Sequence, residues 1–423
     1  MDVDRSTPQN GQSCLIRSRR HSTAERSERV AWTSMTATLA DPVSEVVAAA
    51  QRLLTKRTGA PVTLIDPVNL GGSGQAVVLR VRVSENPFQL PRTLVIKQVR
   101  DLPAESELHA ELADIPGSSA FLREAASYQF ANALATDSRP GPELHAYDLD
   151  ARLLVLSDLG DASPITTLLR NSDEAAVTNS LMAMAQALGR MHAATVGRED
   201  DFAALLRRVG QPDSTDGISA QIPDALAEVP GLLTDLLGVG TTPDAILERV
   251  SRSGRLFAHG AFRAFSPSDL CPDNIIVNDE GVRFLDYEWG GFRDATLDIT
   301  YALASFPGCL CSFELSHDRE QAMIDAWRSE VVGIWPALAD DTTLASKILD
   351  ARLIWVWLST YWFLPDDHTR IAAARAHHLS VPRSQALMSR WAALADSAAR
   401  LGETGIAEYA TSVGTALRTK WER

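Results

Sequence analysis

The sequence predicts an α+β protein of two lobes, in which a small antiparallel sheet with one helix precedes a larger, mainly helical part. Short runs rich in Val, Leu and Ile, separated by turns with Gly, Asn or Pro, follow one another before residue 160. After that point, apolar positions recur at helical spacing, and only residues 274 to 287 return clearly to a β pattern. With 423 residues, of which 45% are hydrophobic, the chain is long enough for such a fold.

Residues 1 to 40 are rich in Ser, Thr and Arg and have no periodic apolar pattern, so we expect a disordered tail there. A transit peptide and a true start at Met35 both stay open. At Asp41 and Pro42 the sequence has an N-cap residue followed by proline at the first helical position, which predicts a helix. We therefore expect lobes at residues 41–159 and 160–423.

The first lobe is expected to contain five strands and a second helix. That helix has Phe121, Ala125, Tyr128 and Ala131 on one face. The expected strands lie at about 62 to 69, 76 to 83, 93 to 99, 143 to 149 and 152 to 157, and the helix lies at about 119 to 136.

In the second lobe, two segments have strong helical patterns. The first has apolar positions at helical spacing, namely Leu181, Met184, Leu188, Met191 and Thr195. The second is an aromatic cluster that we interpret as a buried helix rather than a cation-binding box, namely Trp355, Trp357, Tyr361, Trp362 and Phe363.

Composition excludes several classes of function. The net charge is −14 and no Lys/Arg-rich run occurs, which argues against nucleic acid as a partner. Four cysteines are too few for a disulfide framework, and no second pair completes a zinc site with Cys309 and Cys311. The longest apolar stretch, residues 353 to 364, is too short to span a bilayer. We expect a cytoplasmic protein that binds no membrane; its oligomeric state is left open.

A glycine-rich turn and a lysine in the first lobe are typical of phosphate binding. Asn69 to Gly74 lies between two predicted strands, where glycines bring backbone N–H groups close to phosphate oxygens, although an ordinary hairpin has the same pattern. Lys97 lies inside an apolar run, where its charge needs a partner or ligand, and Glu124 on the next helix is a candidate partner. A solvated lysine on an edge strand is the alternative.

The most specific pattern is Ser268 to Val277, followed by Phe284 to Glu288. Asp269 and Asn274 are five residues apart on a loop, and Asp286 ends the returning strand. Phosphoryl transfer needs a carboxylate to accept the hydroxyl proton and oxygen ligands to hold Mg²⁺ against the phosphates. The pattern therefore predicts Asp269 as the catalytic base and Asn274 and Asp286 as metal ligands. An acidic hairpin turn is the alternative.

In chain order from about residue 62 to residue 300, these motifs resemble the aminoglycoside phosphotransferase family, the small-molecule branch of the protein-kinase-like fold. The resemblance implies ATP and Mg²⁺ as cofactors, a nucleotide-binding first lobe, and a catalytic, acceptor-binding second lobe. It implies structural roles for His192, which packs beneath the site, and for Asp298, which braces it. The remaining implied roles are phosphate contacts by Gly71, Gly72, Ser73, Gly74 and Lys97, pairing of Lys97 with Glu124, and an adenine hinge at Ser157, Asp158 and Leu159.

One departure from the family pattern concerns the catalytic loop. The family usually has His-Gly-Asp, whereas Pro267 and Ser268 precede Asp269 here. His259-Gly260 occurs upstream, but Ala261 follows it, so we assign this pair to the preceding strand. The absence of His-Gly before Asp269 puts the geometry of the loop and the rate of the reaction in doubt more than nucleotide binding.

We expect the second lobe to bind the acceptor, through residues 198 to 255 and the helices after residue 315. Residues 161–423 carry 35 acidic and 23 basic side chains, which favours a cationic acceptor such as an aminoglycoside or amino-alcohol, although acidic surfaces also serve solubility. Three functions stay open: phosphorylation of such a molecule, a choline, homoserine or sugar kinase, and a catalytically weak nucleotide-binding regulator or scaffold.

Overall fold

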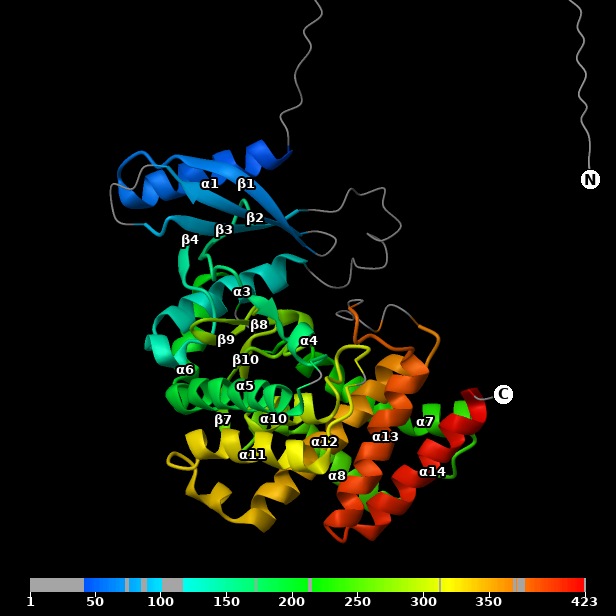
Figure 1. Cartoon of the computed structure of the whole chain (residues 1–423). Coiled ribbons are helices and arrows are strands. Elements are labelled where there is room, and N and C mark those ends of the chain that lie inside the picture. Colours follow the sequence, from blue (N-terminus) through cyan, green and yellow to red (C-terminus); the bar gives the residue numbers. More distant parts are fainter. Residues whose placement is uncertain are drawn as a thin grey trace, which may run out of the picture. The chain divides into compact units, whose positions relative to one another are not determined.

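A computed structural model of the chain describes residues 42–72, 76–84, 90–100, 117–171, 173–211, 215–311, 313–367, 370 and 377–421. These residues belong to one compact unit, Pro42–Arg423. The fold is α+β, as predicted, with a five-stranded antiparallel sheet and a mostly helical remainder (Figure 1). The expected tail, residues 1 to 40, lies outside the described residues, and the boundary at residue 160 stays a prediction.

The sheet has the strand order β1-β2-β3-β5-β4, and all neighbouring strands are antiparallel. Each strand overlaps a range predicted from the sequence. Lys97 lies on β3, the central strand, which excludes the solvated edge strand considered above. The strands are β1 (Leu64–Gly71), β2 (Ala76–Val83), β3 (Thr93–Val99), β4 (Leu144–Asp148) and β5 (Leu153–Ser157).

Two helices cover opposite faces of this sheet. On β5, Leu153 and Val155 belong to a core shared with α1 (Pro42–Thr58), while Leu154 and Leu156 belong to a core shared with α3 (Gly117–Asn132). This division follows from the strand period of two residues.

Helix α3 ends four residues earlier than predicted. The side chain of Asn132 accepts a hydrogen bond from Leu144 N at 3.0 Å and donates to Leu144 O at 2.8 Å, which ties the helix end to β4. Thr136–Ser138 forms a separate 3-10 turn, η1.

The two helical patterns expected in the second part are confirmed. Helix α5 buries all five apolar positions that predicted it, and α12 buries the aromatic cluster. The helices are α4 (Ile165–Leu168), α5 (Glu174–Thr195), α6 (Glu199–Arg208), α7 (Ile222–Leu237), α8 (Asp244–Gly254), α9 (Leu256–His259), α10 (Thr296–Leu303), α11 (His317–Val331), α12 (Asp341–Phe363), α13 (Arg383–Arg400) and α14 (Thr404–Trp421), with 3-10 turns η2 (Ser219–Gln221), η3 (Pro272–Asn274) and η4 (Pro336–Ala339).

The second part has more strands than the sequence predicted. A three-stranded sheet has the order β6-β8-β9, and β10 pairs with β7. The additional strands have two to four residues, and β7 buries three consecutive side chains, so no alternation marks it. The strands are β6 (Ser163–Pro164), β7 (Arg263–Ser266), β8 (Ile275–Asn278), β9 (Gly281–Phe284) and β10 (Gly291–Asp294).

The assignment of His259-Gly260 to the strand before the catalytic loop was wrong. His259 is the last residue of the short helix α9, and β7 begins at Arg263. A short helical turn of buried Leu256 and Phe257 cannot be told from a strand end by its apolar pattern alone.

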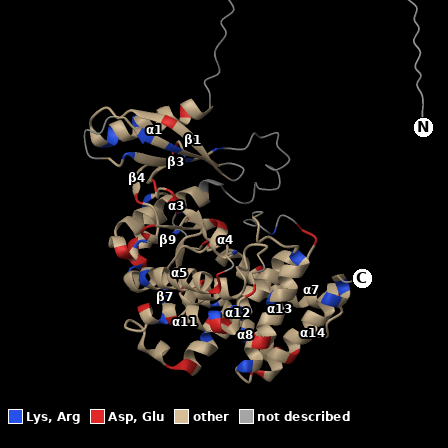
Figure 2. Cartoon of the chain, viewed as in Figure 1, with Lys and Arg blue, Asp and Glu red and all other residues tan. Residues whose placement is uncertain are grey.

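Acidic and basic positions are interspersed over the helices (Figure 2). Helix α6, for example, has three acidic residues in its first turn and Arg207 and Arg208 in its last, an arrangement that complements the helix dipole. Within the described part of the chain, no helix is both long and apolar enough to cross a membrane.

Candidate active site

The side chain of Lys97 joins the five-stranded sheet to the second part of the chain. Its Nζ donates to Glu124 Oε1 on α3 at 2.7 Å and to Asp286 Oδ1 at 2.6 Å. Lys97 and Glu124 are both buried. The pairing with Glu124 is the one predicted from the sequence, whereas the contact with Asp286, 189 residues away along the chain, was not predicted.

The two carboxylates keep the buried lysine charged. Burial alone would lower the pKa of Lys97, but the negative charges of Asp286 and Glu124 together outweigh burial, and the net effect is to raise the pKa. A buried ammonium held between two acceptors is fixed in position, which is the property required of a phosphate clamp.

The β8–β9 hairpin brings Asn274 and Asp286 together. Ile275 pairs with Phe284 at the open end of the hairpin, and Leu285 N donates to Asn274 O at 2.8 Å. Asn274 lies immediately before β8 and Asp286 two residues after β9. Asn274 and Asp286 therefore lie together, as expected from the sequence, because a short hairpin has these two polar residues at its open end.

Asp269 lies on the loop between β7 and η3 and is buried. Its Oδ1 accepts hydrogen bonds from Cys271 N at 3.2 Å and from the hydroxyl of Tyr301 at 3.4 Å. Asn274 Nδ2 donates to Asp269 O at 3.2 Å. The predicted base and one predicted metal ligand thus belong to one hydrogen-bonded loop, and donors on two elements orient the base.

Two residues of the candidate site have backbone angles that side chains rarely adopt. Ser268 has φ of 73° and Asp286 has φ of 55°, both in the left-handed region. Such conformations cost roughly 1 to 3 kcal/mol each and tend to occur at functional sites. Ser268 occupies the position where the family motif has glycine, the residue that adopts this conformation without strain.

We expect Ser268→Gly to be more stable than Ser268→Ala by about 1 kcal/mol. Both variants remove the same hydroxyl, and at an ordinary position alanine is the more stable residue because glycine gains more entropy on unfolding. The left-handed backbone reverses that order. Denaturant unfolding of the two variants measures the difference, and a more stable Ala variant would contradict the strained backbone.

A buried chain of hydrogen bonds supports the catalytic loop. Ser268 N donates to Ser266 Oγ at 3.0 Å, and Ser266 Oγ donates to Asp298 Oδ1 at 2.7 Å. Because Trp327 Nε1 donates to His192 Nδ1 at 3.0 Å, the ring proton of neutral His192 lies on Nε2, which is 3.1 Å from Asp298 Oδ2. His192 and Asp298 are both buried, in keeping with their expected structural roles.

The described part of the glycine turn requires glycine. Gly71 ends β1 with φ of 95°, and its N–H donates to Asn69 Oδ1 at 2.8 Å. At Gly72, φ is 154° and an added Cβ would lie 2.2 Å from Ala76 O, so no residue with a side chain fits. Ser73 and Gly74 lie outside the described residues, so their predicted phosphate contacts remain predictions.

The predicted hinge begins at Ser157, the last residue of β5. Asp158 Oδ1 accepts from Arg80 Nη2 at 2.9 Å, and Leu159 O accepts from Asn278 Nδ2 at 2.9 Å. Ser157 exchanges hydrogen bonds with Glu143 through its backbone N–H and its hydroxyl. The three residues are thus held in place by both parts of the chain, while their role toward adenine stays a prediction.

Two cavities adjoin segments singled out above. One of about 560 Å³ is lined by Ser157, Asp158 and Leu159 but not by Lys97 or Asp286. Another of about 600 Å³ is lined mainly by the expected acceptor segment, from α6, α7 and α8, and also by α9 and the start of β7. Its lining includes no residue of the catalytic loop.

Sequence reasoning missed Tyr301 and Ser266 as parts of the site. Tyr301 lies three residues after Asp298 on α10, and this spacing places both side chains on one helical face toward the loop. That spacing was a usable signal. Nothing local to Ser266 indicates its contact with Asp298, 32 residues away.

No family model matches the chain, and no curated protein matches it. Among solved structures it is similar to a choline kinase from Cryptosporidium parvum Iowa II, with 11% identity over 86% of this chain and 97% of that chain, at a TM-score of 0.45. It is also similar to a choline/ethanolamine kinase family protein from Mesorhizobium loti, with 14% identity over 84% and 93% of the two chains and a TM-score of 0.40. A third is an amicoumacin kinase in complex with AMP-PNP, Ca²⁺ and Ami, with 10% identity over 88% and 96% and a TM-score of 0.42. At these identities and TM-scores each is a likeness only, and the function is inferred from the side chains described above.

Proposed function

We propose that the chain is an ATP-dependent phosphotransferase that transfers the γ-phosphate to a hydroxyl group of a small molecule. The observation that carries this proposal is the buried Lys97, whose Nζ contacts both Glu124 and Asp286. A lysine fixed by a carboxylate, with an aspartate beside it that can bind a metal, forms the phosphate-binding half of such a site.

The donor atoms around the hairpin fit Mg²⁺. This cation prefers oxygen ligands, which the carboxylate of Asp286 and the amide oxygen of Asn274 supply. Because Asn274 Nδ2 donates to Asp269 O, the amide is oriented with its oxygen as the group for a cation. When bound, the metal would neutralise phosphate charge. The exposed apolar side chains of Val68 and Leu70, on either side of Asn69 where the glycine turn begins, offer a surface on which a nucleotide base can pack.

Asp269 is the proposed general base. It accepts the proton of the acceptor hydroxyl as that oxygen bonds to the γ-phosphorus, and the bond between this phosphorus and the bridging oxygen breaks to release ADP. The hydrogen bonds from Cys271 N and Tyr301 hold the carboxylate in one orientation. Positioning of this kind is the main contribution a protein makes to phosphoryl transfer.

A catalytically weak nucleotide-binding protein is the second candidate, and Pro267 and Ser268 in place of His-Gly favour it. The chain of hydrogen bonds from Ser268 N through Ser266 and Asp298 to His192 favours an active enzyme, because it supports the loop by other means. The acceptor class stays a proposal: the acidic surplus of residues 161–423 favours a cationic amino-alcohol or aminoglycoside, and choline, homoserine or sugar kinases remain alternatives.

The test is ATP consumption by the purified chain with Mg²⁺ against a panel of hydroxylated acceptors, with cationic and neutral members matched in size. Turnover that depends on one acceptor class would establish the enzyme and its substrate class. Tight Mg-ATP binding without turnover on any member would favour the regulatory alternative.

We expect Tyr301→Phe to lower kcat by up to about tenfold without changing KM for ATP, because it removes one hydrogen bond that orients Asp269. Initial rates at saturating acceptor measure this change. Tyr409→Phe is the matched control, since it removes a buried hydroxyl that is bonded to Thr242 and not to a residue of the catalytic loop. An equal loss in both variants would show that Tyr301 acts only on stability.

A further inference from the structure

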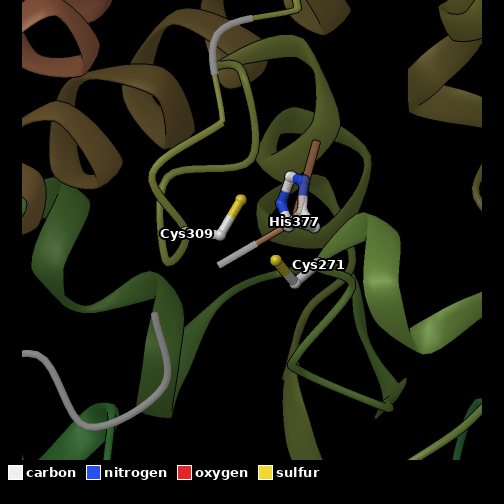
Figure 3. A group of neighbouring side chains, drawn as sticks. All are labelled: Cys271, Cys309 and His377. Carbon is white, nitrogen blue, oxygen red and sulfur yellow. The ribbon is translucent and has the colours of Figure 1, made fainter. Parts of the chain in front are cut away.

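Three side chains that the sequence analysis left without a role meet beside the catalytic loop. A ring nitrogen of His377 and the sulfur atoms of Cys271 and Cys309 all lie within 4.8 Å of one another. Figure 3 shows them pointing toward a common centre from three separate segments. No second pair of ligands accompanies Cys309 and Cys311 in the sequence, but the fold brings Cys271, 38 positions before Cys309, and His377, 68 positions after it, next to Cys309.

The donor set is typical of zinc. Two thiols and an imidazole are the ligands that Zn²⁺ prefers, whereas Mg²⁺ and Ca²⁺ prefer oxygen. Given Zn–S and Zn–N bonds of roughly 2.3 and 2.0 Å, ligand atoms on a tetrahedral zinc ion are about 3.5 to 3.8 Å apart. Ligand atoms already within 4.8 Å reach that geometry by shifts of about an ångström.

The backbone around the cluster holds the ligands in place. Segment 377–381 pairs with segment 309–311 through a bridge between Cys311 and Ser380 and a hydrogen bond from Val381 N to Leu310 O. The buried guanidinium of Arg390 donates to the carbonyl oxygens of Ser305, Phe306 and Cys309. These contacts fix Cys309 and His377 relative to each other before any ion binds.

His377 has a nitrogen suited to coordination. Nδ1 accepts from Leu379 N at 3.0 Å, and Nε2 is buried without a hydrogen-bond partner among the described residues. Burial lowers the pKa of His377, which favours the neutral ring that metals bind. Coordination through Nε2 moves the ring proton to Nδ1, so the contact with Leu379 N is given up.

The thiols of Cys271 and Cys309 are buried. Cys271 and Cys309 are both at most 2% exposed. Burial raises the pKa of Cys271 to about 12, so the metal-free thiol is neutral. Zinc binding would release the thiol protons and leave thiolates whose charge the cation compensates.

We propose that Cys271, Cys309 and His377 bind one zinc ion, and that the ion links the loop of Asp269 to segments 305–311 and 377–381. Cys271 is two residues from Asp269 and donates its N–H to that carboxylate. The consequence for catalysis rests on the proposed function, whereas zinc binding itself does not.

The experiment uses the full chain, purified under reducing conditions, stripped with a chelator and titrated with Zn²⁺ alone. We expect one zinc per chain by elemental analysis after gel filtration, and His377→Gln or Cys309→Ser to weaken binding by about 100-fold, because each ligand carries part of the binding free energy. His378→Gln and Cys14→Ser are the matched controls and should bind like the wild type. His378 is the exposed neighbour of His377, and Cys14 lies outside the described residues.

A second readout covers the case in which a ligand variant fails to fold. Co²⁺ added to the stripped wild type should give the absorption bands of a tetrahedral ion bound to thiolates, and Zn²⁺ should raise its Tm. The proposal would be overturned if the wild type bound no zinc or gave no Co²⁺ bands. It would also be overturned if folded His377→Gln and Cys309→Ser bound zinc as tightly as the wild type. Because neither nucleotide nor acceptor is present, an inactive chain that binds zinc counts against the proposed function alone, and an active chain without zinc counts against this inference alone.

Discussion

Replacing Asp269 by asparagine is expected to lower kcat by about 100- to 10,000-fold, the range for losing a positioned general base. The amide cannot accept the proton of the acceptor hydroxyl at neutral pH. It keeps the shape of the carboxylate and an oxygen that can accept from Cys271 N and Tyr301, so the loop should retain its conformation. The affinity for Mg-ATP is expected to change little, because the proposed metal ligands are other residues.

The matched control is Asp279→Asn, which makes the same chemical change at an exposed aspartate in the turn of the β8–β9 hairpin. Single-turnover assays separate the chemical step from product release, and calorimetry with an unreactive ATP analogue measures nucleotide binding. A variant with wild-type kcat would exclude Asp269 as the base. A variant that loses nucleotide binding as well would assign Asp269 to the metal site instead.

Short-range patterns predicted much of the candidate site. Asp269, Asn274 and Asp286 fall within 18 residues, and the intervening β8–β9 hairpin closes the distance between the last two. Lys97 was recognisable because a charge in an apolar run requires a partner, which Glu124 on the next helix provides. These inferences needed the strand period, the rule that buried charges are paired, and the residue types that phosphoryl transfer requires.

Contacts across long chain separations were not predictable in the same way. The bond between Lys97 and Asp286 depends on how two separately built elements pack, and neither sequence neighbourhood contains that information. The cluster of Cys271, Cys309 and His377 has no local metal-binding spacing, so a search for paired cysteines excluded it. The bounds of β7 were misplaced and β10 was missed, because mostly buried strands of four residues show no clear period.

The hydrogen bonds that support the catalytic loop also bear on the absence of the His-Gly pair of the family motif. Without His-Gly, the loop before Asp269 contains the left-handed Ser268, whose N–H is bonded to Ser266. Ser266 is in turn bonded to Asp298, which His192 contacts from the other side. The doubt about loop geometry raised by the sequence is thus answered by a different set of contacts, while its effect on rate is what the Asp269 experiments measure.

Replacing Asp286 by alanine is expected to remove the dependence of ATP binding on Mg²⁺ and to weaken Mg-ATP binding by at least about 100-fold. Removing a residue that merely orients a metal ligand weakens metal binding by about 10- to 100-fold, and Asp286 is a proposed ligand itself. The fold should survive, since Lys97 keeps its ion pair with Glu124 in the buried site.

Calorimetry with ATP in the presence and absence of Mg²⁺ separates the two effects. Asp286→Ala should bind ATP with the same weak affinity in both conditions, whereas Asp269→Asn should respond to Mg²⁺ like the wild type. If Mg²⁺ still tightened ATP binding in Asp286→Ala, the interaction of Asp286 with Lys97 would be structural and the metal would have to be held elsewhere. The opposite losses in these two variants, one of turnover and one of metal-dependent affinity, would divide the site into a base and a metal ligand on the two sides of a single hairpin.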